Sequence, residues 1–463
     1  MKVIRRRALF HQRPSTNPYR IFLLLTLISL ALYLAIGLEG GSVRNPFSPT
    51  PTSTRTVNSW RLEAETLFEA GNLNAAISAY QVAVQVEPNN AEIWAELARI
   101  QAYSSRLLAS ESQQLARLGE ALASAERAVE LAPENARVVA IHAFVLDWYA
   151  THPLASTPQK YLNLAEQQAL RSLTLDPNNP LALAYYAEIL IDQQKWNQAE
   201  QYIQRALANG SDLMDVHRVY GYYLESTANY RQAIEEYQAA LQINPNLTFL
   251  YISIGQNYRT LALRTTFPPQ QTALYEQALE NFQKAVRLNE QLGIQDPLPY
   301  VAIAKTYAQQ GQFFAAARNA LKAVEIEPAN AELYGQLGNI YKRARNYEAS
   351  ILALKCAVRG CTPVESCQVR NGCPPGDPGT TVIGLPLTPG SATYYLDYGS
   401  VLSAFSPLYP YYCDEAEDVL SQLIAAYGED PTVRLNAEVG LNICASVRAQ
   451  QQPTSLPSPS PTP

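Results

Sequence analysis

Apolar side chains recur at spacings of three and four residues over most of the segment 57–445. One copy carries bulky residues at Tyr334, Leu337 and Tyr341, with a small residue at Gly338. Residues 300–307 and 251–258 repeat the same order. Spacings of three and four place such residues on one face of a helix. The pattern therefore predicts a helix with an aromatic face and one small residue, where a second helix can approach closely.

A second pattern follows each of these segments and is built from alanine. In one copy it runs Ala316, Ala320, Ala323, and then a turn containing Pro328. Alanine favours the helical state and permits close helix contacts, and proline ends a helix because it lacks the N–H group. The same turn recurs at Pro88, Pro133, Pro177, Pro245 and Pro328. Each unit is therefore expected to be a helix, a turn and a second helix.

The spacing of the turns indicates a repeat of 34 residues. The steps between the five prolines are 45, 44, 68 and 83 residues, of which 68 is twice 34. A fixed period of this size is typical of a solenoid, in which neighbours stack because no single unit can bury its own apolar face. We expect an all-α solenoid of nine units over 57–360 and 392–447, closed by a helix near 433–447. The units begin near Val57, Ala91, Ala136, Pro180, Met214, Thr248, Pro297, Ala331 and Ala392.

Four of these units contain inserts between their two helices. Because such turns lie along one edge of a solenoid, the inserts are expected to thicken a single rim. They occupy 104–117, 151–161, 265–275 and 406–413.

The cleanest unit resembles the tetratricopeptide repeat family, whose signature places aromatic, small and alanine residues before a closing proline. The residues that carry this resemblance are Tyr220, Gly221, Leu224, Tyr230, Ala233, Tyr237, Ala240 and Pro245. The resemblance implies a right-handed solenoid with a concave groove, lined by first helices, that binds a peptide or a partner helix. It implies a scaffold for protein partners rather than an enzyme.

Carried onto this chain, the resemblance assigns a mildly basic, polar strip to the groove of units five to eight. Such a strip favours an acidic segment or a C-terminal carboxylate. The carboxylate-clamp set of Lys, Asn and Arg known in the family is not found. The groove candidates are Arg218, Tyr222, Arg259, Lys305, Asn339, Lys342 and Arg343.

The first 56 residues form separate segments. Residues 1–20 contain six basic residues and no acid, and 21–38 is an 18-residue stretch without charge. Such a stretch is long enough to cross a bilayer, and the positive flank leaves the N-terminus in the cytoplasm. We expect a single-pass signal anchor at 21–38 with the repeats outside the cytoplasm; a cleaved signal peptide is the alternative. Residues 39–56 and 448–463 are interpreted as a Pro/Ser/Thr-rich linker and a disordered tail.

The charge balance argues against nucleic acid as a partner. The chain has 35 basic and 41 acidic residues, and without the six basic residues of 1–20 the balance is 29 against 41, or −12. Phosphate backbones need clustered Lys and Arg. A protein partner is therefore expected, and the six basic residues are assigned to the membrane surface.

All six cysteines lie after residue 355. An even count in one extracytoplasmic region favours disulfides, and the wide spacing disfavours zinc. We expect Cys413 to pair with Cys444, because the helices that carry them should touch, and the other four to cross-link the Pro/Gly-rich loop 361–391. These four are Cys356, Cys361, Cys367 and Cys373.

No motif of the sequence supports catalysis. A phosphate-binding glycine loop and a Gly-x-Ser-x-Gly elbow are both missing from the sequence, and its four histidines are scattered. His142 is expected to be a packed core residue. We therefore expect no enzymatic activity, no cofactor and no metal. The favoured function is a scaffold at the envelope; the alternatives are a surface or wall-associated structural protein, or an accessory subunit of a polysaccharide or secretion system.

Overall fold

The computed structural model describes residues 17–39 and 56–451. It divides into two compact units, residues 1–56 and 57–463. The predictions for residues 1–16, for 40–55 in the linker and for the tail 452–463 lie outside the described residues.

The first unit contains one helix, α1 (Pro18–Glu39). Its apolar side chains from Ile21 to Tyr33 are largely exposed. Within the described residues, no helix combines the length and the apolar character needed to cross a membrane. The anchor at 21–38 stays a prediction.

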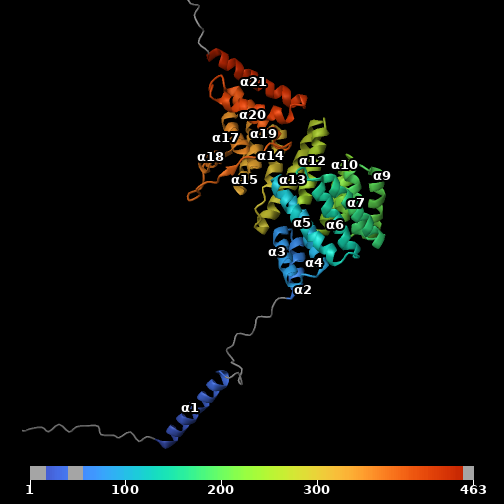
Figure 1. The fold of residues 1–463 in the computed structure, drawn as a ribbon, viewed down its shortest axis with the longest axis vertical. Coiled ribbons are helices and arrows are strands. Elements are labelled where there is room, and N and C mark those ends of the chain that lie inside the picture. Colours follow the sequence, from blue (N-terminus) through green and yellow to red (C-terminus); the bar gives the residue numbers. More distant parts are fainter. Residues whose placement is uncertain (1–16, 40–55, 452–463) are drawn as a thin grey trace, which may run out of the picture. The chain divides into compact units, whose positions relative to one another are not determined.

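The second unit is an all-helical solenoid, which confirms the predicted fold class (Figure 1). Nine antiparallel helix pairs follow one another along the chain, and α21 closes the array. The pairs are α2 (Val57–Glu69) and α3 (Leu73–Val86), α4 (Ala91–Ser105) and α5 (Glu111–Leu131), α6 (Ala136–Ala150) and α7 (Pro158–Leu175), α8 (Pro180–Asp192) and α9 (Trp196–Gly210), α10 (Met214–Ser226) and α11 (Tyr230–Ile243), α12 (Thr248–Arg264) and α13 (Pro268–Leu292), α14 (Leu298–Gln309) and α15 (Phe313–Ile326), α16 (Ala331–Arg343) and α17 (Tyr347–Val358), α19 (Ala392–Phe405) and α20 (Tyr412–Tyr427), followed by α21 (Pro431–Gln451).

Asparagine starts several of the first helices. The Asn90 and Asn179 side chains accept hydrogen bonds from the backbone N–H groups of Ile93 and Ala182. Asn135 and Asn330 cap α6 and α16 in the same way. An N-cap of this type contributes about 1 kcal/mol. In these four turns the proline follows the end of one unit and the asparagine begins the next. The Pro245 turn differs, because the N-cap of α12 is Leu247, which makes no side-chain cap.

Small residues on the first helices allow the two helices of a pair to approach closely. A Cβ atom on Gly255 would collide with the Phe282 ring, and one on Gly338 would lie 2.6 Å from Cγ of Leu354. Both large side chains are fully buried. Each glycine therefore leaves the space that the large side chain opposite it fills, so the two helices of the pair pack closely.

The array coils back so that distant units touch. The Asn246 side chain donates a hydrogen bond of 3.0 Å to the Glu69 carbonyl, which joins the turn before α12 to the first pair. Ala109, in the insert of the second pair, packs against the apolar cluster of α14–α17. The Glu111 carboxylate lies against Gly390, just before α19. The insert 104–117 is therefore a contact between early and late units, rather than a free rim.

The segment between α17 and α19 is cross-linked by disulfides, and only part of it is helical. It contains β1 (Gly360–Cys361), α18 (Pro363–Val369) and β2 (Val382–Ile383), the two strands being antiparallel. All six cysteines are paired, as Cys356–Cys361, Cys367–Cys373 and Cys413–Cys444. Cys413–Cys444 joins α20 to α21, and Cys356–Cys361 fastens the end of α17.

His142 is a buried core residue of α6, and both of its ring nitrogens lack a hydrogen-bond partner among the described residues. Burial lowers the pKa of His142 to about 4. A histidine whose folded pKa lies below its unfolded value costs stability as pH falls from about 6.5 towards 4, because only the unfolded chain then binds the proton. The native chain should therefore lose roughly 3 kcal/mol of its free energy of unfolding between pH 6.5 and pH 4 through this group, at 1.36 kcal/mol per pKa unit. His142→Gln should remove this part of the loss. Thermal midpoints between pH 4 and 7 test this; parallel profiles for both chains would contradict it.

Candidate binding groove

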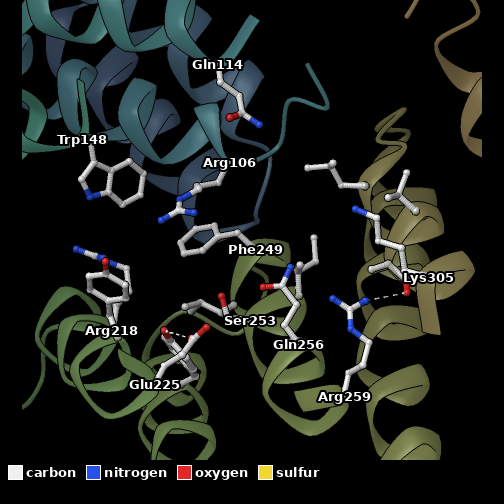
Figure 2. A pocket seen from close by; sticks show the side chains of 17 residues that line it. Arg106, Gln114, Trp148, Arg218, Glu225, Phe249, Ser253, Gln256, Arg259 and Lys305 are labelled. Atoms are coloured by element: carbon white, nitrogen blue, oxygen red, sulfur yellow. Dashed lines mark hydrogen bonds between the residues drawn. The ribbon is translucent and has the colours of Figure 1, made fainter. Parts of the chain in front are cut away.

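A cavity of about 330 Å³ lies on the inner surface of the coil, between α4–α6 on one side and α10–α14 on the other (Figure 2). Arg106, Gln114 and Trp148 approach it from the early units, and Arg259 and Lys305 from the later ones. We call this cavity, together with the two smaller cavities that adjoin it, the groove. The remaining lining residues of the first cavity are Arg218, Tyr222, Glu225, Tyr237, Phe249, Leu250, Ile252, Ser253, Gln256, Leu298, Val301 and Ala302.

The groove continues at both ends. A cavity of about 240 Å³ shares Arg106, Gln114, Trp148 and Tyr222 with it and reaches α8. A cavity of about 290 Å³ shares Arg259 and Lys305 and reaches α16 and α19. The hollow therefore follows the inner surface from the second unit to the ninth.

A buried ion pair forms the floor at one end. Arg218 donates two hydrogen bonds to Glu188, of 2.7 and 2.5 Å, and only 5% of Arg218 is exposed. The Trp148 indole donates to the same carboxylate at 2.9 Å. The guanidinium lies within 5.5 Å of the ring centres of Tyr103, Phe144 and Trp148. Arg218 is thus held by charge, hydrogen bonds and cation–π contacts, and it is already neutralised.

A second buried pair lies behind the first. Arg99 donates to Asp215 at 2.9 Å, and the hydroxyl groups of Tyr103 and Tyr185 donate to the same carboxylate. Burial alone would raise the pKa of Asp215, but the charge of Arg99 and the two hydroxyl donors hold this pKa below its ordinary value. Asp215 is therefore a satisfied anion.

Two further carboxyl groups, those of Asp147 and Asp192, lie near the groove, and their pKa values are raised where that of Asp215 is lowered. Burial raises the pKa of Asp147 well above its ordinary value, and the adjacent Asp192 raises it further. Burial also raises the pKa of Asp192, which accepts a 2.5 Å hydrogen bond from Tyr222. Burial and the adjacent carboxyl group therefore favour the protonated form of Asp147, which reduces the negative charge near the groove.

Three cations that line the 330 Å³ cavity lack a carboxylate partner among the described residues. Arg106 lies over the Trp148 ring at 4.9 Å, and Arg259 donates to the Ala302 carbonyl at 3.4 Å. Burial lowers the pKa of Lys305, and the charge of Arg259 lowers it further. We call Arg106, Arg259 and Lys305 the open cations.

The carboxylates near the open cations are occupied by other donors. Glu225 accepts hydrogen bonds from Tyr237 and Asn257, each of 3.0 Å. Glu332 accepts from Tyr394 at 2.6 Å, and burial raises its pKa. The open cations therefore leave this part of the groove electropositive within an acidic chain.

The seven candidates from the sequence lie in three kinds of position. Arg259 and Lys305 line the groove as open cations, while Arg218 and Tyr222 line it with their polar groups engaged by Glu188 and Asp192. Asn339 and Lys342 both contact Asp397 of α19. Arg343 is exposed and donates to the Ala308 carbonyl at 3.0 Å. Their role in binding stays a prediction.

Sequence reasoning missed the contribution of the early units. Arg106 directly follows α4, and Gln114 lies in the first turns of α5, within the insert of the second pair. The order of units along the chain places this insert far from Lys305; only the coiling of the array brings them to one cavity. Within the described residues, no cluster of His, Cys, Asp or Glu has the arrangement of a metal site.

Comparisons with known proteins agree with this fold. Tetratricopeptide repeat models match residues 57–100 and 187–248. Anaphase-promoting complex subunit 7 of Homo sapiens is 27% identical over 194 residues, 42% of this chain and 31% of that protein. The same subunit of Mus musculus is 26% identical over equal shares of both chains. The match thus spans about a third of these relatives.

Solved structures align over more of the chain. The human IFIT1 dimer with PPP-AAAA aligns at a TM-score of 0.51 and 16% identity, over 85% of this chain and 92% of the other. The dimer with m7Gppp-AAAA gives 0.51 and 15%, over 88% and 92%. At these identities the likeness concerns the fold alone. The chain thus contains tetratricopeptide repeats in a helical solenoid, a class that generally mediates protein–protein contacts and is generally non-enzymatic.

Proposed function

We propose that this protein is a non-enzymatic scaffold whose groove binds an extended, acidic segment of a protein partner. The observation that carries the proposal is the convergence of Arg106, Arg259 and Lys305 on one cavity without carboxylate partners. A carboxylate entering the groove would meet charged donors whose desolvation is already partly complete.

The walls favour an extended segment of a polypeptide. Gln114, Ser253 and Gln256 offer amide and hydroxyl groups for backbone hydrogen bonds, and Trp148 and Phe249 offer apolar surface. A cavity that combines apolar side chains with placed polar groups is typical of specific binding sites. The connected cavities would hold successive residues of such a segment.

We place the repeats outside the cytoplasm, with 21–38 as the membrane anchor. The basic stretch before the apolar segment and the pairing of all six cysteines support this location. The scaffold would then hold its partner at the outer side of the membrane.

Neutralising two open cations should weaken acidic-peptide binding at least tenfold. Arg259→Gln with Lys305→Gln removes two charge-assisted contacts, and hydrogen bonds to charged groups are worth about 1.5–3 kcal/mol each. A labelled Glu-rich peptide, followed by fluorescence anisotropy at low and high salt, provides the measurement. Its Gln-for-Glu counterpart should bind weakly to the native chain.

Lys284→Gln with Lys322→Gln is the matched control, because both lysines are exposed and pair within their own helices. Equal affinity of the two double variants would contradict the proposal. Tighter binding of a single-stranded oligonucleotide, lost in the Arg259/Lys305 variant, would assign the groove to nucleic acid instead.

A further inference from the structure

The late end of the groove combines three cations in one cavity. Arg259, Lys305 and Arg343 all line the cavity of about 290 Å³ there, and among the described residues that line it none is acidic. The other two cavities of the groove both have carboxylates in their walls. We call the site formed by these three cations the cation subsite. It is therefore the part of the groove with the largest excess of positive charge.

The two arginines are fixed on either side of α14. Arg259, on α12, donates to the Ala302 carbonyl at 3.4 Å, and Arg343, on α16, donates to the Ala308 carbonyl at 3.0 Å. The two guanidinium groups also lie 5.8 and 5.7 Å from the centres of aromatic rings on α13 and α15. Each guanidinium is thus oriented by a neutral carbonyl and a ring, and neither contact supplies a full negative charge.

Lys305 lies midway between these two anchors on α14. Because Ala302, Lys305 and Ala308 follow one another at steps of three residues, they run along one side of the helix, and the two carbonyls are about 9 Å apart along its axis. Figure 2 shows Arg259 next to the helix that carries Lys305. Burial and the charge of Arg259 both lower the pKa of Lys305, and Glu332 offsets this only in part. The three positive charges are therefore close together and incompletely compensated.

The carboxylates nearest to the cation subsite do not neutralise it. Glu332 accepts hydrogen bonds from Tyr394 at 2.6 Å and from Gln336 at 3.4 Å, and burial raises its pKa. Glu111 lies against Gly390 but does not itself line the cavity. Within the part of the chain that the structure describes, none of the three cations forms an ion pair. The full counter-charge is therefore left for a ligand to supply.

We propose that the cation subsite binds a phosphate monoester, carried as a phosphorylated side chain by the acidic segment in the groove. This inference rests on the proposed function, because the segment has to reach the late end of the groove. A phosphorylated side chain carries about −1.5 to −2 charges at pH 7 and three acceptor oxygens, whereas a carboxylate carries one charge and two oxygens. Arginine forks match phosphate oxygens with paired hydrogen bonds, and lysine adds a point charge. Three cations around one cavity therefore favour phosphate over carboxylate.

Three forms of one peptide test this inference. A labelled Glu-rich peptide is prepared with serine, phosphoserine or glutamate at one position, which is moved along the peptide in turn, and its affinity for the full chain is measured by fluorescence anisotropy. At the position that reaches the cation subsite, the phosphoserine form should bind at least tenfold more tightly than the glutamate form. Only phosphoserine places a second charge and a third acceptor oxygen among the three cations.

Arg343→Gln assigns this preference to the cation subsite, because Arg343 lines the late cavity but not the cavity of about 330 Å³. The substitution should weaken binding of the phosphoserine form at least tenfold and that of the glutamate form less than threefold. Unchanged binding of the glutamate form also shows that the variant is folded. Lys322→Gln is the control and should change neither affinity, because this lysine is exposed and pairs with Glu325 of its own helix.

Equal affinity of the phosphoserine and glutamate forms at every position would overturn the inference and leave the proposed function in place. Absence of binding by the glutamate form would contradict the proposed function, and the subsite would then stand only if the phosphoserine form still binds through Arg343. Free phosphoserine that competes as strongly as the phosphorylated peptide would overturn the segment as the source of the phosphate. Tighter binding of a 5′-phosphorylated oligonucleotide than of the phosphorylated peptide would assign the subsite to nucleic acid instead.

Discussion

Replacing Arg218 with alanine should lower the free energy of unfolding by about 3–5 kcal/mol, because it leaves a charged carboxylate buried without its partner. Glu188 is 3% exposed and takes two hydrogen bonds from Arg218. The substitution also removes the cation from between the Tyr103, Phe144 and Trp148 rings. Thermal and urea midpoints, followed by circular dichroism, measure the loss.

A double variant separates the cost of a broken pair from the value of the intact pair. Arg218→Met with Glu188→Met leaves no unpaired buried charge, and we expect it to recover most of the lost stability. Lys284→Ala, which removes an exposed pair with Glu280, serves as the control and should change stability by less than about 1 kcal/mol. If Arg218→Ala were as stable as this control, the Arg218–Glu188 pair would not contribute to the stability of the fold as predicted.

Loss of the Cys413–Cys444 bond should have the next largest effect on stability. The two cysteines are 31 residues apart, and the entropy of the loop that they close corresponds to about 3–4 kcal/mol. Paired Cys413→Ala and Cys444→Ala substitutions should therefore lower the midpoint of the C-terminal units, because α21 is otherwise held mainly by its packing on α19 and α20.

The Cys356–Cys361 bond provides the comparison. Its separation is five residues, and the same relation gives about 2 kcal/mol. Removing it should cost less, and a reducing agent should lower the midpoint of the native chain but not that of a chain without cysteines. Equal losses for the two pairs would contradict an effect that depends on loop length. Native midpoints that do not respond to reduction would contradict the disulfides themselves.

The repeat architecture was predictable because its determinants are local. The spacing of Tyr334, Leu337 and Tyr341 selects a helix and one of its faces. Each proline turn stops a helix within a few residues, and in four of the five turns an asparagine such as Asn90 caps the next helix. Repeated units can bury these faces only by stacking, so the solenoid follows from the period alone.

The candidate site was predictable only in part, because the character of a groove residue depends on its partners. Arg218 and Arg259 lie two turns apart within their units, on α10 and α12, but on the same face of a first helix. Arg218 meets Glu188, which is 30 residues earlier, whereas Arg259 meets the Phe282 ring and a backbone carbonyl. Nothing within a single unit distinguishes an arginine that is neutralised from one that is open.

The sequence by itself determined the helical units, their order and the proline-rich segment at the end, since these depend on neighbours within one or two turns of the chain. Only the tertiary structure decided which cations stay open and where the insert of the second unit lies. The coiling that brings Ala109 and Glu111 to the late units, and Arg106 to the same cavity as Lys305, sums small rotations between successive units. That sum depends on the packing of every interface along the array, and no local pattern encodes it.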